Sequence, residues 1–218
     1  MTRAFRARCL AELIGTFCLV FCGTGAVVVE QVTGKLGHLG ISLVFGLVVL
    51  AMIYAIGHVS GAHMNPAVTI AFHAAGRHER SEIVPYVAAQ LLGAVAASAV
   101  LKLLFMGQTT NLGTTLPAGT VLQSFVFELV MSFMLMFTIM GVATDDRAEG
   151  TMAGIAIGGL IALEAAFGGP ISGASMNPAR SFGPALLTGN FAHHWLYWAA
   201  PIFGTLLGAG AYRAIAER

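Results

Sequence analysis

The chain has 218 residues, of which 57% are hydrophobic and 10% are charged. Soluble domains carry about 25% charged residues, so this composition excludes an ordinary soluble domain and indicates a membrane protein. The formal net charge of +1 provides no electrostatic basis for binding nucleic acid. The three cysteines, Cys9, Cys18 and Cys22, lie in one apolar segment, which favours packed free thiols over a disulfide framework.

Six apolar segments have about the 20 residues that a helix needs to cross a bilayer. In chain order they cover residues 9–30, 39–57, 82–105, 121–143, 151–168 and 195–216. Two further apolar stretches begin at Asn65 and Asn177, run for about ten residues each and are too short to span. Such re-entrant backbone persists only where protein or a water-filled cavity surrounds it. The sequence therefore predicts an all-α membrane protein with six transmembrane helices, two re-entrant half-helices and a pore.

The basic residues predict how the chain is oriented in the membrane. If both termini are cytoplasmic, most arginines fall on the cytoplasmic side, namely Arg3, Arg6, Arg8, Arg77, Arg80, Arg147, Arg213 and Arg218. Lys35 and Lys102 lie near the other face, and Arg180 lies within the second short segment. The positive-inside rule then predicts a multi-pass protein of the plasma membrane (the inner membrane of a bacterium) with cytoplasmic termini.

The sequence contains an internal repeat. Residues 60–69 read SGAHMNPAVT and recur 112 residues later as SGASMNPARS at 172–181, with seven of the ten positions identical. An apolar helix with one acid opens each half, Glu12 in the first and Glu128 in the second. Because each half holds an odd number of spans, the second half must enter the membrane from the opposite side. The two short segments of this inverted repeat are expected to meet near the middle of the bilayer.

The dipeptides Asn65-Pro66 and Asn177-Pro178 indicate the start of a short helix in each half. Asn is a strong N-cap residue, and Pro is favoured at the first helical position. Once its oxygen caps the helix, each asparagine is expected to leave its NH2 group free to donate into the pore. A passing water must then offer its oxygen to both donors, which interrupts any hydrogen-bonded chain for proton hopping. Two helix N-termini, each with about half a positive charge, also disfavour cations.

One difference between the two copies introduces a charge. Val68 of the first copy corresponds to Arg180 of the second, in the first turn of its short helix. A charge at this depth is costly and usually faces a cavity or a partner. We therefore expect the Arg180 guanidinium to line the outer part of the pore and to repel cations, with a buried ion pair to Glu164 as the alternative.

The two Asn-Pro-Ala boxes, the opening Ala-Glu-Leu-Ile-Gly-Thr at 11–16 and the six long and two short apolar segments resemble the major intrinsic protein family of aquaporins and glycerol facilitators. Residues 169–181 are most similar to the nodulin-26-like branch, whose members occur in plants and bacteria. The resemblance covers residues 1–218 as a single channel domain, with repeats at about 9–105 and 121–216. It implies a homotetramer in the lipid bilayer with one pore per subunit, no cofactor or metal, no nucleic-acid partner and no enzymatic activity.

The resemblance also implies which residues line the pore. The paired boxes are Asn65, Pro66, Ala67 and Asn177, Pro178, Ala179. An outer constriction, the selectivity filter, is expected from Phe45, Ala165, Ala174 and Arg180. A ladder of acceptor carbonyls is expected from Gly61, Ala62, His63, Met64, Gly173, Ala174 and Ser175, with His63 contributing no more than its carbonyl. Glu12 and Glu128 are expected to brace the two re-entrant loops as structural acids.

The filter residues predict the solutes. Strict water channels of this family usually have His where this chain has Ala165, and often Cys or Thr where it has Ala174. A wider, partly apolar filter favours passage of glycerol, urea, or boric and arsenous acid in addition to water. Four other positions match the water-channel pattern instead, namely Ser181, Ala185, Tyr197 and Trp198. A mainly water-selective channel is therefore the alternative.

Glu164 lies in an apolar span beside Ala165. An acid at this depth is a functional candidate by default, and we expect a structural role in which it accepts backbone amides of the second re-entrant loop or holds Arg180. It is also the candidate for ion coupling in a rival class, the secondary transporters, which share inverted repeats and broken helices. An intramembrane enzyme is disfavoured because the chain has no paired carboxylates, Gly-x-Ser-x-Gly elbow or His-Glu-x-x-His motif. An adhesive membrane protein with a closed pore is a third class.

Overall fold

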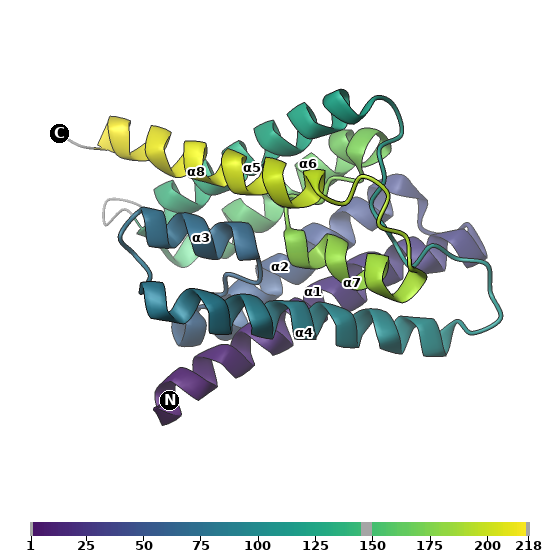
Figure 1. Cartoon of the computed structure of the whole chain (residues 1–218), viewed down its shortest axis with the longest axis horizontal. Coiled ribbons are helices and arrows are strands. Elements are labelled where there is room, and N and C mark those ends of the chain that lie inside the picture. The colour runs from purple at the N-terminus through teal and green to yellow at the C-terminus, as the bar shows by residue number, and fades with distance from the viewer. Residues whose placement is uncertain (1, 145–149, 217–218) are drawn as a thin grey trace.

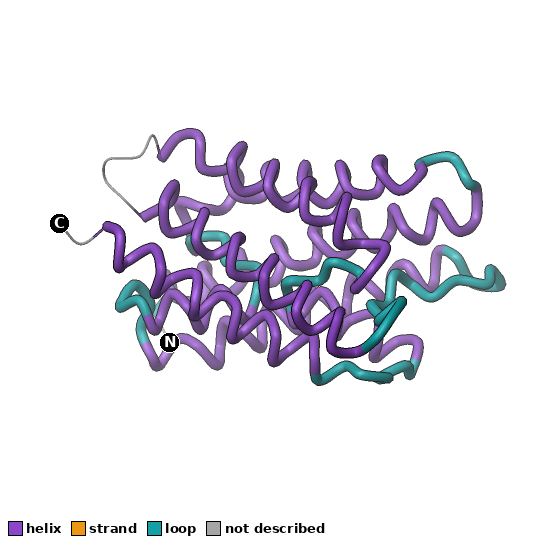
Figure 2. Tube along the Cα trace, turned by 90° about the horizontal axis from the view of Figure 1, so that it is seen from above, coloured by secondary structure: helices purple, strands orange, loops and turns teal. Residues whose placement is uncertain are grey.

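The computed structural model describes residues 2–144 and 150–216, and its helices form one bundle (Figure 1). In chain order the helices are α1 (Arg3–Thr33), α2 (Gly37–Ser60), α3 (Pro66–Ala74), α4 (Arg80–Leu104), α5 (Val121–Thr144), α6 (Ala153–Ser172), α7 (Pro178–Thr188) and α8 (Leu196–Ala216). A short 3-10 helix, η1 (Gly150–Met152), precedes α6. Figure 2 shows the long helices running side by side, with most loops at the two ends of the bundle. The predicted all-α fold is confirmed.

Six of the described helices are long and two are short, in the order that the sequence predicts. Five are long and apolar enough to cross a membrane by length and composition, namely α1, α2, α4, α5 and α6. The sixth, α8, has 21 residues, and its Trp, Tyr, Pro and Gly residues lower its mean hydropathy. The helices α3 and α7 have 9 and 11 residues, so neither can span a bilayer.

Several helices extend beyond the apolar segments that predicted them, and α1 and α6 show why. Helix α1 begins at Arg3, because the Thr2 hydroxyl accepts a capping hydrogen bond from the Phe5 N–H at 3.2 Å. Helix α6 continues through Pro170 to its end at Ser172. Because proline has no N–H, the carbonyl four residues earlier in α6 loses its intrahelical donor. That carbonyl is available to a side chain from another helix.

Both termini lie at the same end of the bundle, on the left in Figure 1, together with the turn between α3 and α4. Basic residues begin α1, flank that turn and close α8, namely Arg3, Arg6, Arg8, Arg77, Arg80 and Arg213. Arg147 and Arg218, which also support the predicted orientation, lie outside the described residues. An ion pair between Arg8 and Glu82 joins α1 to α4 at this end.

The two halves of the chain pack as an inverted repeat. Helix α1 packs along α4 in the first half and α5 along α8 in the second, while α2 and α6 cross between the halves. At this crossing a Cβ on Gly46 would lie 2.4 Å from the Gly158 carbonyl oxygen, and one on Gly158 would lie 2.6 Å from the Gly46 carbonyl oxygen. The two glycines are 112 residues apart, as the two boxes are. They therefore mark the pseudo-twofold axis that relates the halves.

The half-helices α3 and α7 lie between α4 and α8 with their N-termini directed toward each other (Figure 1). Each follows a loop that returns from the end of a long helix, α2 for α3 and α6 for α7. A glycine with positive φ closes each of those long helices, Gly61 at 86° and Gly173 at 87°, a conformation that favours glycine. The local sequence thus turns the chain back into the bundle at the same place in both halves.

Candidate functional site

Asn65 and Asn177 begin the two half-helices as capping residues. Asn65 Oδ1 accepts from the Ala67 N–H at 2.9 Å. Asn177 Oδ1 accepts from the N–H groups of Ala179 and Arg180 at 3.0 and 3.3 Å. A proline follows each asparagine at the first helical position, where its missing N–H has no intrahelical partner to lose. All residues of the two boxes are buried, namely Asn65, Pro66, Ala67, Asn177, Pro178 and Ala179.

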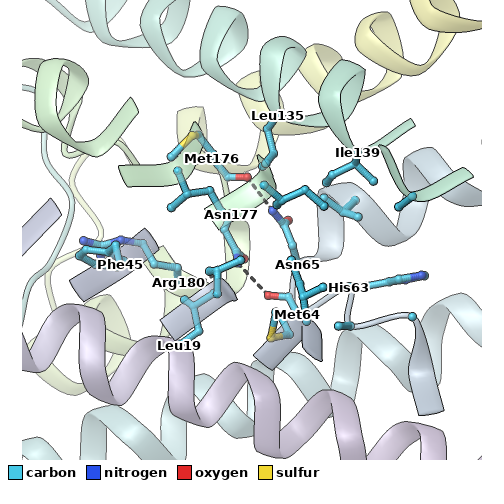
Figure 3. A pocket seen from close by; sticks show the side chains of 18 of the residues that line it. Leu19, Phe45, His63, Met64, Asn65, Leu135, Ile139, Met176, Asn177 and Arg180 are labelled. Carbon is cyan, nitrogen blue, oxygen red and sulfur yellow. Dashed lines mark hydrogen bonds between the residues drawn. The ribbon is translucent and has the colours of Figure 1, made fainter. Parts of the chain in front are cut away.

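The amide nitrogens of the two asparagines reach across the pseudo-twofold axis. Asn65 Nδ2 donates to the Met176 carbonyl and Asn177 Nδ2 donates to the Met64 carbonyl, both at 2.8 Å (Figure 3). The sequence suggested that each whole NH2 group is free, whereas one of its two N–H bonds joins the two loops. The second N–H of each amide is left for the cavity, which both asparagines line.

Glu12 holds the loop before α3 from within α1. One of its oxygens accepts from the Ser60 hydroxyl at 2.7 Å and from the His63 N–H at 2.9 Å. The other accepts from the Met64 N–H at 2.6 Å and from the Gln90 side-chain amide at 2.8 Å. The side chain is fully buried, so its carboxylate supplies acceptors to loop groups that water does not reach.

Glu128 makes the corresponding contacts in the second half, from within α5. One oxygen accepts from the Ser172 hydroxyl at 2.7 Å and from the Ser175 N–H at 2.8 Å. The other accepts from the Met176 N–H at 2.7 Å. Glu128 is fully buried as well. Each acid therefore binds the backbone of one re-entrant loop, as a bracing role requires.

Both re-entrant loops have a strained backbone. Positive φ angles occur at Ala62 and Met64, both 48°, and at Ala174 and Met176, 41° and 53°. Non-glycine residues in this region cost about 1–3 kcal/mol each and persist where their surroundings hold them. The residues expected to form the carbonyl ladder line two adjoining cavities, Gly61, Ala62, His63, Met64, Ala174 and Ser175 in the first and Gly173 with Ala174 in the second.

Arg180 marks one end of the first cavity. Its side chain is 4% exposed, and Nη1 donates to the Gly113 carbonyl at 2.6 Å. The guanidinium lies 5.1 Å from the centre of the Phe45 ring, a cation–π contact. In Figure 3 Arg180 and Phe45 lie together at one end, His63 lies at the other, and the two asparagines lie between them.

The four residues expected at the constriction meet in space. Phe45, Ala165, Ala174 and Arg180 come from α2, α6, the second re-entrant loop and α7, and all four line both cavities. The first cavity has a volume of about 100 Å³, and its wall includes apolar side chains such as Leu135, Ile139 and Ile157. The second, on the Arg180 side, has a volume of about 510 Å³. We call this second cavity the Arg180-side vestibule.

The expectation for Glu164 is wrong. It is fully buried, but neither carboxylate oxygen accepts a hydrogen bond from any residue that the structure describes. The amides of the second re-entrant loop are bound by Glu128, and Arg180 donates to Gly113. Glu164 lies eight residues before the end of α6 at Ser172, about two helical turns away from the loop that follows this helix.

Residues in the long connection between α4 and α5 contribute to the site without any motif to mark them. Gly113 supplies the carbonyl that holds Arg180, and the Thr115 hydroxyl lies 2.7 Å from the Ser181 hydroxyl on α7. The sequence of this connection is indistinguishable from an ordinary linker. The glycine itself is the one feature of the sequence that could have marked this position. Its φ of 72° and the close approach of Thr24 both require glycine at 113.

His63 contributes its side chain as well as its backbone. Nδ1 lies 3.1 Å from the Thr69 hydroxyl oxygen, and the ring stacks on Phe72 with the centroids 4.6 Å apart. It also contacts the rings of His78 and Tyr86, at 5.0 and 5.3 Å between centroids. Of these four ring-containing residues, His63 and Phe72 line the first cavity, while His78 and Tyr86 pack behind the His63 ring.

Comparison with known proteins places this geometry in a family. The Major intrinsic protein family matches residues 1–212 of the chain. The chain is 48% identical over 212 residues to Aquaporin NIP1-1 of Zea mays, which covers 97% of this chain and 75% of that protein. It is also 48% identical over 212 residues to Nodulin-26 of Glycine max, covering 97% of this chain and 78% of the relative.

A solved structure agrees with these relatives. The X-ray structure of the aquaglyceroporin from Plasmodium falciparum matches with a TM-score of 0.87 at 26% sequence identity, over 95% of each chain. The relatives of this chain are aquaporins, and aquaporins are channels rather than enzymes. The chain therefore belongs to the major intrinsic protein family, as a multi-pass membrane protein with the fold of an aquaporin channel.

Proposed function

We propose that the protein is a passive channel that conducts water and small uncharged solutes and excludes ions and protons. The observation that carries the proposal is the constriction at the Arg180 end. There two large side chains, Phe45 and Arg180, and two alanines, Ala165 and Ala174, line both cavities. The family and the likeness to an aquaglyceroporin structure support the channel class.

Exclusion of ions and protons follows from charge and hydrogen bonding along this path. Arg180 puts a buried cation at the constriction, and the N-termini of α3 and α7 each add about half a positive charge at the centre. The oxygens of Asn65 and Asn177 are occupied as helix caps, so their amides act as donors toward the cavity. A water at the centre presents its oxygen to both, which interrupts proton hopping.

Passage of solutes larger than water follows from the two alanines. Ala165 and Ala174 project a single methyl group each into the constriction, and the cavity beyond it has a mainly apolar wall with asparagine amides and loop backbone on another side. A small solute with hydroxyl groups on one side and C–H groups on the other matches such a wall. Glycerol has this pattern, and urea and boric or arsenous acid are small and neutral.

Reconstitution of the purified protein in liposomes tests the proposal. Stopped-flow light scattering follows shrinkage under an impermeant osmolyte, which measures water flux, and re-swelling under glycerol, which measures solute flux. We expect fast shrinkage followed by fast, protein-dependent re-swelling, after which boric and arsenous acid are compared. Shrinkage without re-swelling identifies a mainly water-selective channel, and flux that requires an ion gradient identifies a transporter.

The variant Ala165→His is the matched test of the constriction. An imidazole in place of a methyl group narrows the path, so we expect glycerol flux to fall by about tenfold or more while water flux persists. Leu163→Ala, on the exposed outer surface of α6 and away from both cavities, serves as the control. Unchanged glycerol flux in the Ala165→His variant would place the constriction elsewhere.

We propose further that the chain forms a homotetramer in the plasma membrane, with one pore per subunit and both termini in the cytoplasm. The support is the family and the many large apolar side chains on the outer surface, which suit lipid or a neighbouring subunit, such as Leu39, Leu92 and Leu207. Native mass spectrometry from detergent tests the subunit number, and a mass other than four chains contradicts it.

A further inference from the structure

His38 lies in the wall of the Arg180-side vestibule, and no sequence motif marks it. It is the second residue of α2, and its side chain is exposed. The vestibule that it lines also contains Phe45, Ala165 and Arg180 of the proposed constriction. A solute that approaches the constriction from this side therefore passes the imidazole.

A hydrogen bond to α6 holds the His38 ring in place. Pro170 has no N–H, so the Ala166 carbonyl, four residues earlier, lacks its intrahelical donor. His38 Nε2 lies 2.8 Å from that carbonyl oxygen. The imidazole thus replaces the missing donor, at the residue that directly follows Ala165.

The neighbouring residue Gly169 leaves room for the ring. A Cβ at this position would lie 2.7 Å from His38 Cε1. The ring therefore packs directly on the backbone of α6, and its position is set by a proline, a glycine and a free carbonyl of one helical turn. A side chain that is fixed in this way can present a polar atom at a defined place.

The hydrogen bond to Ala166 also determines which ring nitrogen of His38 is left for a solute. A carbonyl oxygen only accepts, so His38 Nε2 must carry the proton, and in the neutral ring Nδ1 is then a bare acceptor. Arg180 lines the same vestibule, and its guanidinium carries more N–H donors than the one on Nη1 that binds the Gly113 carbonyl. The vestibule therefore offers an acceptor on α2 and donors on α7.

We propose that His38 is a specificity-determining residue for neutral solutes with several hydroxyl groups. Its Nδ1 atom accepts an O–H of the solute, while Arg180 donates to another solute oxygen at the constriction. Together the two groups replace part of the solute's hydration before it enters the narrow path. The inference rests on the proposed channel function, and it adds a solute contact from α2 on the vestibule side of the constriction.

Three variants separate this role from a purely structural tether. His38→Phe keeps a ring of similar shape and removes both the donor and the acceptor. His38→Lys keeps a donor for the Ala166 carbonyl and removes the acceptor. His38→Gln keeps both functions in its side-chain amide and is the conservative variant. Each is reconstituted in liposomes, and the ratio of glycerol to water permeability is measured together with the melting temperature in detergent.

We expect the glycerol-to-water ratio to fall about three- to tenfold in the Phe and Lys variants, as for one lost hydrogen bond, and to return toward the wild-type value in the Gln variant. Glycerol and water permeability that fall together, or a ratio that stays unchanged, would overturn the role of His38. Wild-type protein without glycerol flux would overturn the proposed solute range and this inference together. Normal wild-type glycerol flux with an unchanged variant ratio would overturn this inference alone.

Discussion

Glu128 and Glu164 are both fully buried, and they lie on the adjacent helices α5 and α6. Glu128 accepts three hydrogen bonds from Ser172 and the loop that follows it, whereas Glu164 accepts none from the described part of the chain. The free energy of a buried acid depends on such partners, because the acid has given up its hydration in either case. The same substitution at the two positions should therefore change the stability of the protein differently.

Glu128→Gln is expected to lower the free energy of unfolding by about 1–3 kcal/mol, because the new NH2 group meets a loop N–H and leaves a buried donor unsatisfied. Glu164→Gln removes no hydrogen bond and is expected to be neutral or stabilising. Thermal denaturation in detergent compares the two variants, and equal losses would contradict the contacts assigned to Glu128. Liposome flux provides a second comparison, since undiminished downhill flux in Glu164→Gln argues against a coupled transporter.

At the scale of elements, the crossing of α2 and α6 determines the positions of Phe45 and Ala165 at the constriction. Phe45 is adjacent to Gly46 on α2, and Ala165 lies two turns beyond Gly158 on α6. The backbones touch at the two glycines, and a methyl group on either would collide with the other's carbonyl oxygen. The approach of these helices therefore sets the distance across the constriction.

Gly46→Ala is expected to separate α2 from α6, because its Cβ would lie 2.4 Å from a backbone oxygen that cannot move alone. Such overpacking costs about 1–3 kcal/mol, and the melting temperature should fall accordingly. Gly159→Ala is the matched control on α6, since a Cβ there has nothing within 4 Å. A Gly46→Ala protein as stable as the Gly159→Ala protein would show that the crossing tolerates a wider spacing.

At the scale of the whole molecule, the structure makes the topology testable. Both termini lie at one end, and the loop between α1 and α2, which contains Lys35, lies at the other (Figure 1). In a bacterial host we expect a fluorescent protein fused to the C-terminus to fluoresce and an alkaline phosphatase inserted after Lys35 to be active, because fluorescence requires the cytoplasm and phosphatase activity the opposite side. The reverse pattern would invert the proposed orientation.

Much of this architecture could be predicted because it depends on local sequence patterns. Apolar runs of spanning length and the two Asn-Pro-Ala boxes need no tertiary information, and the repeat relates them. The bond from Arg180 to Gly113 and the bond from His38 to Ala166 could not be predicted, because each joins elements far apart in sequence and leaves no periodicity. Glu164 was misjudged for the same reason, since nearness along a helix does not give the direction of a side chain.

The exchange of hydrogen bonds between Asn65 and Met176 and between Asn177 and Met64 has a consequence for the origin of the fold. Two copies of a single half-length chain, inserted in opposite directions, would make the same pair of contacts, as in an isologous homodimer. Gene duplication and fusion would then free each half to diverge wherever the axis does not impose symmetry. Val68 and Arg180 occupy equivalent positions in the two halves and are such a divergence. Because only one half carries the arginine, the two ends of the pore differ.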